Sequence, residues 1–588
     1  MMTNRLLRRP LTCFALLLLA VIAQTQAKNI FVAQASRGNN TGADAANAHP
    51  ATWFNTGGNW GTGVARISAG DTVHLSGTIS TGLTVNGSGT TSMPINILFD
   101  QDAKLSAPVW SPNAITVNED WIIIDGGTNG LIECTDNGTT LGHRQENVYG
   151  IFGSGTGITV RNLTIDKIYV RTPFSTSDAL RAGEGIELSG SNITVTGCTL
   201  REGDTMISLT WTAGRHKNYT ITGNTIGRCN HGITVGTADA SAFLDSVIIA
   251  DNIINDLDVW GPISGNHLDG MIIFNESPNY SGRTNVLRIY GNRIGPNIGT
   301  INTAGVFVIC YIDTQFQNLL IYNNIFTSRS GYAWSNGFIA AAGKDCIIAN
   351  NTFIGSCTAI TTQHHASCYN NLAYGIDGGL VCTPSASPLP PSNTIANWDY
   401  NVLYFGKNSF LMVYNTYGDR YDTKSSWQSA TGFDTHSSTS KPALDTVTGM
   451  LKPGDTVATG KGKNLSEYFS TDFFGGTRPR AGEGSWDIGA HQSLSNQKAA
   501  PRPATRSRPN PAARWDRAGN LVVWAETNGP GSDLKARILD IAGRVIAVKN
   551  LSANEQWVTS LSAAQGAYLL EVSSEGTPVL REKLLLNR

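Results

Sequence analysis

Acidic and imidazole side chains recur at the start of successive strand-like segments in the middle of this chain. When these segments are aligned, one column holds Glu184, Asp204, His231 and Asp269, followed by Ala304 and Asn336. If the segments are parallel strands, successive members of the column lie about 4.8 Å apart. Paired carboxyl groups hydrolyse glycosidic bonds when they lie about 5–5.5 Å apart in retaining enzymes or about 6.5–9.5 Å apart in inverting enzymes. Adjacent and alternate strands would supply these two separations.

We expect Asp204 and Asp269 to act as acid and as base or nucleophile, with His231, His267 and Glu184 assisting them. A carboxyl group crowded by other acids holds its proton toward neutral pH, as a general acid must. His267 is included because it stands two residues before Asp269 at a strand entrance. The alternative is that these polar residues only cap turns, although like charges stacked at this spacing repel each other.

A β-elimination site would need a different set of residues. A base must remove the proton next to a carboxylate, and a cation must neutralise that carboxylate. Arg215, His216 and Lys217 lie together in a loop between two of the segments and could supply both groups. Oxygen atoms of Glu202 and Asp204 are suitable ligands for Ca²⁺, which a lyase could use, whereas the hydrolase requires no cofactor. The basic loop is also explained as a solvated surface feature.

Aromatic residues fall in loops around the same segments: Trp211, Trp260, Tyr311 and Trp334. Aromatic faces can stack on sugar rings, so these residues are candidate substrate-binding groups together with the basic loop. Each is also explained by packing within its loop.

An eight-residue pattern repeats through this region. The windows are ITVRNLTI from Ile158, ITVTGCTL from Ile193, YTITGNTI from Tyr219, VIIADNII from Val247, LRIYGNRI from Leu287, LLIYNNIF from Leu319 and CIIANNTF from Cys346. Each alternates apolar and other residues, which is the periodicity of a β-strand. The sixth position is asparagine in five consecutive windows: Asn224, Asn252, Asn292, Asn324 and Asn351. Stacked coils would let these side chains hydrogen-bond along the stack, so the repeat predicts a parallel β-helix.

The chain from 28 to 492 resembles the right-handed parallel β-helix proteins of the pectate-lyase-like superfamily. IFVAQASRGNNTG followed by ISAGDTVHLSGTI is similar to the opening coil of that family, and RPRAGEGSWDIGAHQ is similar to a closing segment of its exported bacterial members. EGDTMI from Glu202 and CNHGITVG from Cys229 resemble two adjacent motifs of its polygalacturonase-like hydrolases. One Asp stands where those hydrolases have a pair. No Arg-x-Lys motif follows the second of these two motifs within 28–492. The resemblance implies an all-β solenoid that acts on a polysaccharide.

Both ends of the chain carry features of export. Arg5, Arg8 and Arg9 precede an apolar run and small residues, which predicts a signal peptide over 1–27. A Pro/Arg-rich linker follows the solenoid at 493–514, and alternating segments over 515–588 predict a small C-terminal β-sandwich. ILDIAGRVI, LSAAQGAYLLEV and EKLLL resemble the sorting domain of the bacterial type IX secretion system, the alternative being a carbohydrate-binding sandwich. The resemblance implies a partner in the secretion machinery and a secreted or cell-surface location.

Composition narrows the class of protein further. Of 588 residues, 15% are charged and the formal net charge is −1, against about 25% charged residues in an average globular chain. This balance argues against a nucleic-acid-binding protein, and no later stretch is apolar enough to span a membrane. Without a C-x-x-C pair, we expect the remaining cysteines to be buried thiols rather than zinc ligands. We expect a monomer.

Three functions stay open on the sequence. The column of carboxyl and imidazole groups favours an exported polysaccharide-degrading glycoside hydrolase. The basic loop keeps a polysaccharide lyase in view. A non-catalytic surface adhesin or sugar-binding solenoid would require neither.

Overall fold

The computed structural model describes the greater part of the chain. In the solenoid it describes residues 27–135, 148–168, 183–210, 213–237, 239–257, 268–275, 283–297, 302–310, 315–328, 337–341, 343, 345–362, 366–382, 395–406, 410–414 and 419–493. Beyond the solenoid it describes 510–515, 521–526, 534–540, 545–551, 556–559, 566–574 and 577–586. The predicted signal peptide therefore lies almost wholly outside the described residues.

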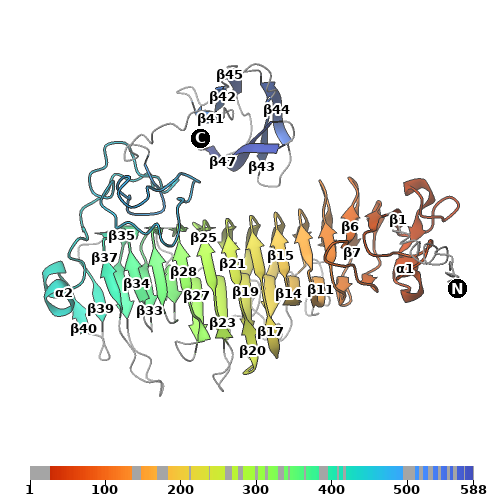
Figure 1. The fold of residues 1–588 in the computed structure, drawn as a ribbon, viewed down its shortest axis with the longest axis horizontal. Coiled ribbons are helices and arrows are strands. Elements are labelled where there is room, and N and C mark those ends of the chain that lie inside the picture. Colours follow the sequence, from red (N-terminus) through yellow and green to blue (C-terminus); the bar gives the residue numbers. More distant parts are fainter. Residues whose placement is uncertain are drawn as a thin grey trace, which may run out of the picture.

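The described part of the solenoid is a parallel β-helix, which confirms the predicted fold (Figure 1). One long sheet takes a short strand from each coil. In spatial order these strands are β2 (His49–Pro50), β1 (Asn29–Ala33), β3 (Thr72–Leu75), β6 (Ile95–Phe99), β9 (Ile122–Asp125), β12 (Thr159–Arg161), β15 (Ile193–Thr196), β18 (Tyr219–Thr222), β21 (Val247–Ala250), β25 (Leu287–Tyr290), β28 (Leu319–Tyr322), β31 (Cys346–Ala349), β34 (Ala366–Tyr369) and β37 (Asn397–Asp399). The repeated windows of the sequence supply seven of these strands, from β12 to β31.

A second, larger sheet forms the remaining sides of the coils. Its strands in chain order are β4 (Thr78–Ile79), β5 (Leu83–Val85), β7 (Lys104–Ala107), β8 (Asn113–Val117), β10 (Leu131–Cys134), β11 (Val148–Thr156), β13 (Thr164–Asp166), β14 (Gly183–Ser191), β16 (Thr199–Thr210), β19 (Thr225–Thr237), β22 (Ile253–Leu257), β23 (Leu268–Asn275), β26 (Arg293–Ile294), β27 (Asn302–Cys310), β29 (Ile325–Thr327), β30 (Ile339–Ala341), β32 (Thr352–Ile354), β33 (Thr358–Thr362), β35 (Leu372–Ile376), β36 (Gly378–Cys382), β38 (Val402–Phe405), β39 (Met412–Tyr414) and β40 (Asp419–Tyr421). A small outer sheet contains β17 (Gly214–His216), β20 (Ala242–Leu244) and β24 (Arg283–Thr284).

The core is a set of aliphatic stacks that run along the solenoid axis. Strand register places one fully buried stack at Val160, Val195, Ile221, Ile249, Ile289, Ile321 and Ile348. Branched side chains suit these positions because they pack well on a pleated surface and lose little rotamer freedom there. Each coil buries its apolar face only against its neighbours, so the solenoid is stable only as a stack.

The predicted asparagine stack is present, and it is longer than the repeat indicated. Each ladder Asn accepts hydrogen bonds through Oδ1 and donates through Nδ2 to the next Asn along the stack, for example Asn324 Nδ2 to Asn351 Oδ1 at 3.0 Å. The ladder starts at the backbone of Cys198, whose N–H donates to Asn224. It continues through Asn371 to Asn401, whose own N–H donates to Ser437 Oγ at 2.8 Å. These buried amides satisfy the backbone groups that the turn between two strands would otherwise leave unpaired.

The residue before each ladder Asn lies in the left-handed region of backbone space. Gly, Asp or Asn occupies this position in six coils, at Gly223, Asp251, Gly291, Asn323, Asn350 and Asn370, and Tyr400 occupies it in the last coil. Gly, Asn and Asp tolerate positive φ, whereas other residues seldom adopt it. The Tyr400 backbone, with φ of 59°, is therefore the exception in this row.

The last part of the solenoid, residues 433–493, packs along this row of turns, and we call it the closing segment. Asn350 Nδ2 donates to the backbone oxygens of Asp487 and Gly489, and Asn370 exchanges hydrogen bonds with the backbone of Lys463. Arg478 is fully buried here, and its guanidinium donates to the backbone oxygens of Asp487 and Gly489. The closing segment therefore covers the outer side of the final coils.

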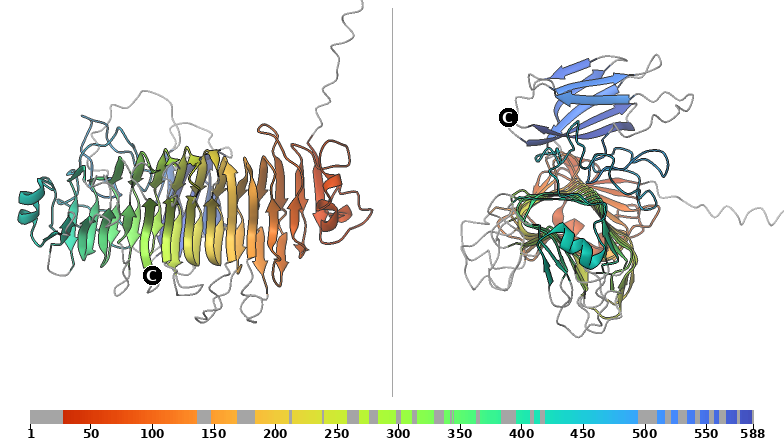
Figure 2. Two further views of the ribbon diagram at one scale, coloured as in Figure 1. Left: turned by 90° about the horizontal axis from the view of Figure 1, so that it is seen from below. Right: turned by 90° about the vertical axis from the view of Figure 1, so that its left-hand side faces the viewer.

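Short helices lie at the two ends of the stack (Figures 1 and 2). Near the N-terminal end are α1 (Ala51–Phe54) and two 3₁₀ turns, η1 (Ala45–Asn47) and η2 (Gly57–Asn59). At the other end, α2 (Lys424–Thr431) buries Trp427, whose indole N–H donates to Asp434 at 2.8 Å. In the view along the axis, α2 lies across the open end of the solenoid. The helices at both ends thus cover core side chains that have no further coil to pack against.

Beyond the solenoid the chain forms two antiparallel sheets. One contains β41 (Asn510–Trp515), β42 (Leu521–Glu526) and β45 (Gln556–Thr559), and the other contains β44 (Val545–Leu551), β43 (Leu534–Asp540), β46 (Gly566–Ser574) and β47 (Thr577–Leu586). β41 begins five residues before 515, the predicted start of the sandwich. The packing of these sheets as a sandwich stays a prediction. Among the described residues, no helix has the length and apolar character to cross a membrane.

Six cysteines are reduced and buried, as predicted: Cys134, Cys198, Cys229, Cys346, Cys357 and Cys368. Burial raises the pKa of the Cys134 and Cys198 thiols to about 12. These residues therefore behave as small apolar side chains of the core.

Replacing a central ladder amide should destabilise the whole solenoid. The backbone N–H and the side-chain amide of Asn292 both donate to Asn324 Oδ1. Asn324→Ala removes this acceptor from both donors. Because an unpaired buried polar group costs about 1–3 kcal/mol, we expect the free energy of unfolding to fall by about 2 kcal/mol or more, measured as a lower urea midpoint. The matched control is Asn129→Ala, an exposed amide with one long hydrogen bond of 3.4 Å. Equal midpoints for the two variants would contradict this role of the ladder.

Candidate active site

A bend in each of the longest strands sets the geometry of the site. In β14, Gly185 and Ile186 both face the interior, so the alternation of inner and outer side chains is interrupted. The same doubled inner pair recurs at 150–151 and 232–233, and the strand register places Ile207 and Met271 beside Ile233. A Cβ on Gly185 would lie 2.5 Å from the Met206 carbonyl oxygen, so the close approach of backbones at the bend requires glycine. Side chains directly before and after the bend project to the same outer side.

Two columns of outer side chains flank the bend. The pre-bend column consists of Tyr149, Glu184, Thr205, His231, Asp269 and Ala304. The post-bend column consists of Phe152, Glu187, Ser208, Thr234 and Ile272. Successive members of a column lie on adjacent strands of a parallel sheet, about 4.8 Å apart.

The predicted column is wrong at one position, because Thr205 rather than Asp204 pairs with Glu184 and His231. The other coils carry glycine directly after the column residue, whereas β16 has Met206 there. Without that glycine, the bend in β16 cannot be recognised from the sequence. The sequence-based alignment of this strand with its neighbours is therefore displaced by one residue. Asn336, the last predicted member, lies outside the described residues.

Glu184 and Glu187 lie on opposite sides of the bend and interact with each other. Their carboxyl groups share a hydrogen bond, and Ser208 also bonds to Glu184. Burial, the charge of Glu187 and the charge of Asp204 raise the pKa of Glu184 well above its usual range. Burial also raises the pKa of Glu187, while its hydrogen bond with Glu184 opposes that rise. Two acids in contact do not readily ionise together, so the further-raised pKa of Glu184 makes it the donor in its hydrogen bond with Glu187.

Asp204 stands beside this pair and is held by groups from the next coil. The amide Nδ2 of Asn230 donates to Asp204 Oδ1. Burial raises the pKa of Asp204, and the positive charge of a protonated His231 and the bond from Asn230 lower it. His231 Nε2 lies 3.7 Å from Asp269 Oδ2. The structure therefore brings together Glu184, Asp204, His231 and Asp269 despite the displaced register.

Asp269 differs from the other three in its accessibility. Its side chain is fully buried, and its Oδ1 accepts the backbone N–H of Ala304 at 3.0 Å. The His231 side chain is 16% exposed. Asp269 can therefore orient His231, but it has no surface on which to meet a substrate.

Several residues of the site were not found by sequence reasoning: Tyr149, Glu187, Ser208 and Asn230. Burial and the charges of Glu187 and Glu184 raise the pKa of the Tyr149 phenol to about 12, so it remains a hydrogen-bond donor at neutral pH. Its ring lies 4.9 Å from that of Phe152. Glu187 could have been predicted from the sequence Glu-Gly-Ile-Glu at 184–187. Its glycine permits the bend that brings the two acids to the same side of the strand.

The predicted basic group lies on another element. Arg215 and His216 belong to β17 of the small outer sheet, where Arg215 forms an ion pair with Asp245 at 3.1 Å. His216 Nδ1 lies 2.9 Å from the Gly190 carbonyl oxygen, and Lys217 is exposed. Glu202, the other proposed calcium ligand, forms an ion pair with Arg228 at 2.8 Å. In the described ranges, no three His, Cys, Asp or Glu side chains are grouped as metal ligands.

The remaining predicted site residues lie outside the described residues. These are His267, Trp211, Trp260, Tyr311 and Trp334. Their assignment stays a prediction.

The described residues define a parallel β-helix protein with a carboxyl-rich site on the outer side of its longest strands. Among solved structures, the chain is similar to pectate lyase Pel9A, with 12% identity and a TM-score of 0.33 over 79% of this chain and 96% of that chain. It is also similar to a double mutant of the tailspike protein of E. coli bacteriophage HK620, with 12% identity and a TM-score of 0.33 over 59% of this chain and 74% of that chain. No protein-family model and no curated protein sequence matches this chain. Likenesses at this level say nothing about the activity of this chain.

The crowded acids should make stability fall as the pH rises. A folded-state pKa above the unfolded value means that the folded chain binds more protons, so stability is lost from about pH 4.3, the ordinary glutamate pKa, up to the raised pKa. Because Glu184 has such a raised pKa, Glu184→Gln should raise the thermal midpoint at pH 7–8 and leave it nearly unchanged at pH 4.

The control for this measurement is Glu467→Gln, which replaces an exposed glutamate elsewhere. Its difference from the wild-type midpoint should not grow between pH 4 and pH 8. A Glu184→Gln difference that is constant with pH would show that Glu184 ionises normally.

Proposed function

We propose that this chain is an exported enzyme that hydrolyses a polysaccharide. The observation that carries the proposal is the crowding of Glu184 against Glu187 and Asp204, which together with burial raises the pKa of Glu184 well above its usual range. A proton donor and a carboxylate in one site are the two groups that glycosidic cleavage requires.

Each described residue then has a part in the reaction. Glu184 donates its proton to the glycosidic oxygen as the bond to the leaving group breaks, and Glu187 stabilises the proton on Glu184 beforehand. Asp204, held by Asn230, acts as nucleophile or as the base that activates water. His231 hydrogen-bonds a sugar hydroxyl and is oriented by Asp269, which is a positioning residue. No step of this scheme uses a metal ion.

Hydrolysis is favoured over β-elimination by the groups around Glu184 and Asp204. Elimination acts next to a carboxylate of the sugar, which a cation must neutralise. The described neighbours of the two acids are carboxyl, hydroxyl, amide and imidazole groups, and Arg215 is paired with Asp245. Glu187 and Asp204, once ionised, would repel an anionic sugar, so we infer that the substrate is a polysaccharide that is neutral at the cleaved bond.

The location of the protein is part of the proposal. The signal-like first 27 residues and the resemblance of the C-terminal strands to a sorting domain support export to the cell surface or medium. The secretion machinery would then be a partner of 515–588, and the solenoid would meet its polysaccharide outside the cell.

Purified protein should release reducing ends from a neutral polysaccharide in a panel of neutral and uronic glycans, without loss of activity in EDTA. Glu184→Gln and Asp204→Asn should each lower kcat by about 10²–10⁴, and Glu467→Gln should not. On an aryl glycoside with a nitrophenol leaving group, which needs no proton, Glu184→Gln should regain most of its rate while Asp204→Asn does not.

Other outcomes would identify the alternatives. An unsaturated product that absorbs ultraviolet light, with loss of activity in EDTA, would identify a calcium-dependent lyase. Binding without any product would identify an adhesin. Full activity of both variants would remove Glu184 and Asp204 from the mechanism.

A further inference from the structure

A second site lies at the last described coil of the solenoid, away from the carboxyl pair. A cavity of about 560 Å³ lies between that coil and the closing segment, and its lining includes Tyr400, His436, Ser438, Ser440, Thr456 and Lys461. We propose that this cavity binds a saccharide unit of a glycan chain. The inference does not require Glu184 or Asp204 to be catalytic.

The first argument is the backbone of Tyr400. Its φ of 59° lies in the left-handed region, where the six preceding coils use only Gly, Asp or Asn. In the two nearest coils, Asn350 and Asn370 use their amides to bind the closing segment. Tyrosine provides no such amide and is strained at this φ. A strained residue that breaks the pattern of its row supports a hypothesis of function at that position.

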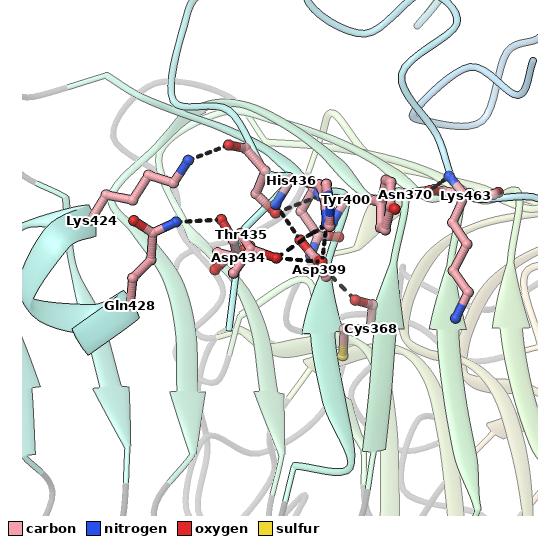
Figure 3. Close-up of polar contacts among 12 residues, drawn as sticks. Cys368, Asn370, Asp399, Tyr400, Lys424, Gln428, Asp434, Thr435, His436 and Lys463 are labelled. Atoms are coloured by element: carbon pink, nitrogen blue, oxygen red, sulfur yellow. Dashed lines mark hydrogen bonds and ion pairs between the residues drawn. The ribbon is translucent and has the colours of Figure 1, made fainter. Parts of the chain in front are cut away.

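The second argument is what the Tyr400 ring contacts. It stacks on the His436 ring, with centroids 4.5 Å apart and planes inclined by 10°. Both residues line the cavity, and Figure 3 shows them beside each other. The apolar face of a sugar ring packs on such a surface, and its hydroxyl groups find partners in polar side chains at the rim.

The third argument is the fixed orientation of His436. Its Nδ1 lies 2.7 Å from Asp399 Oδ2, and its backbone N–H donates to Asp399 Oδ1 at 2.7 Å (Figure 3). Burial would raise the pKa of Asp399, but the hydrogen bonds from His436, Tyr400 and Thr435 outweigh it and lower that pKa. An ionised Asp399 selects the tautomer with hydrogen on Nδ1. Nε2 of His436, on a ring that is 58% exposed, is then available to hydrogen-bond a sugar hydroxyl.

The rest of the lining suits the same ligand. Ser438, Ser440 and Thr456 supply hydroxyl groups, and Lys461 supplies an exposed ammonium group. Hydroxyl and amine donors around an aromatic face are the groups that recognise a pyranose ring. The site lies on the row of turns, whereas the carboxyl pair lies on the long strands, so one glycan chain could be held at the first while another part reaches the second.

The decisive variant is Tyr400→Asn, because asparagine is the residue that the preceding coils use at this position. It should unfold at an unchanged or higher temperature, since the strain is relieved, yet lose glycan binding by about tenfold or more. The experiment is a glycan array probed with the full chain carrying Glu184→Gln and Asp204→Asn, so that no glycan is cleaved. Tyr468→Asn, which removes an exposed tyrosine of the same closing segment, is the matched control and should bind normally.

His436→Ala in the same background should also lower binding to the glycans that depend on Tyr400. Retention of every bound glycan by Tyr400→Asn would overturn the proposal, as would an array on which nothing binds in a Tyr400-dependent way. A lower unfolding temperature with unchanged binding would show that Tyr400 only holds the closing segment. Because the array measures binding and not cleavage, a negative result here does not contradict the proposed hydrolase activity. A negative result in the hydrolysis assays likewise does not contradict this binding site.

Discussion

The coils from Cys198 onward depend on the hydrogen-bonded ladder of buried asparagines. Each coil must turn sharply between two strands, and the turn leaves backbone N–H groups inside the protein that need partners. The ladder from Asn224 to Asn401 supplies them by repeating one side chain at one position. Because every amide bonds to its neighbours in the stack, the ladder fixes the register of successive coils as well as the turn. The long strands can then carry side chains in columns.

Columns explain why charged groups meet in this fold without being close in sequence. Glu184 and Asp204 stand on adjacent coils, and Asn230 and His231 come from the next one. The bend at Gly185 adds a second column, which places Glu187 against Glu184. The resulting crowding, together with burial, raises the pKa of Glu184. A site that works against stability is the pattern expected where chemistry rather than packing selected the residues.

The two proposed sites use the same scaffold in different ways. The carboxyl site uses the outer side of the long strands, where the bend makes two columns converge. The Tyr400 site uses the row of left-handed turns, where the closing segment leaves a cavity over the last coil. In both, the sequence departs from the local rule of the repeat: acids stack where like charges repel, and a tyrosine takes a turn position suited to asparagine.

The sequence by itself determined the solenoid, because strand alternation and the recurring Asn are local features that survive any variation in loop length. It also indicated the coils on which the acids gather. Only the tertiary structure decided which residue of β16 enters the column, since Met206 hides the bend that glycine marks elsewhere and a shift of one residue changes the face. The tertiary structure alone also brought Asp399 and Tyr400 against His436, because segments that are distant along the chain carry no shared pattern from which their packing can be read.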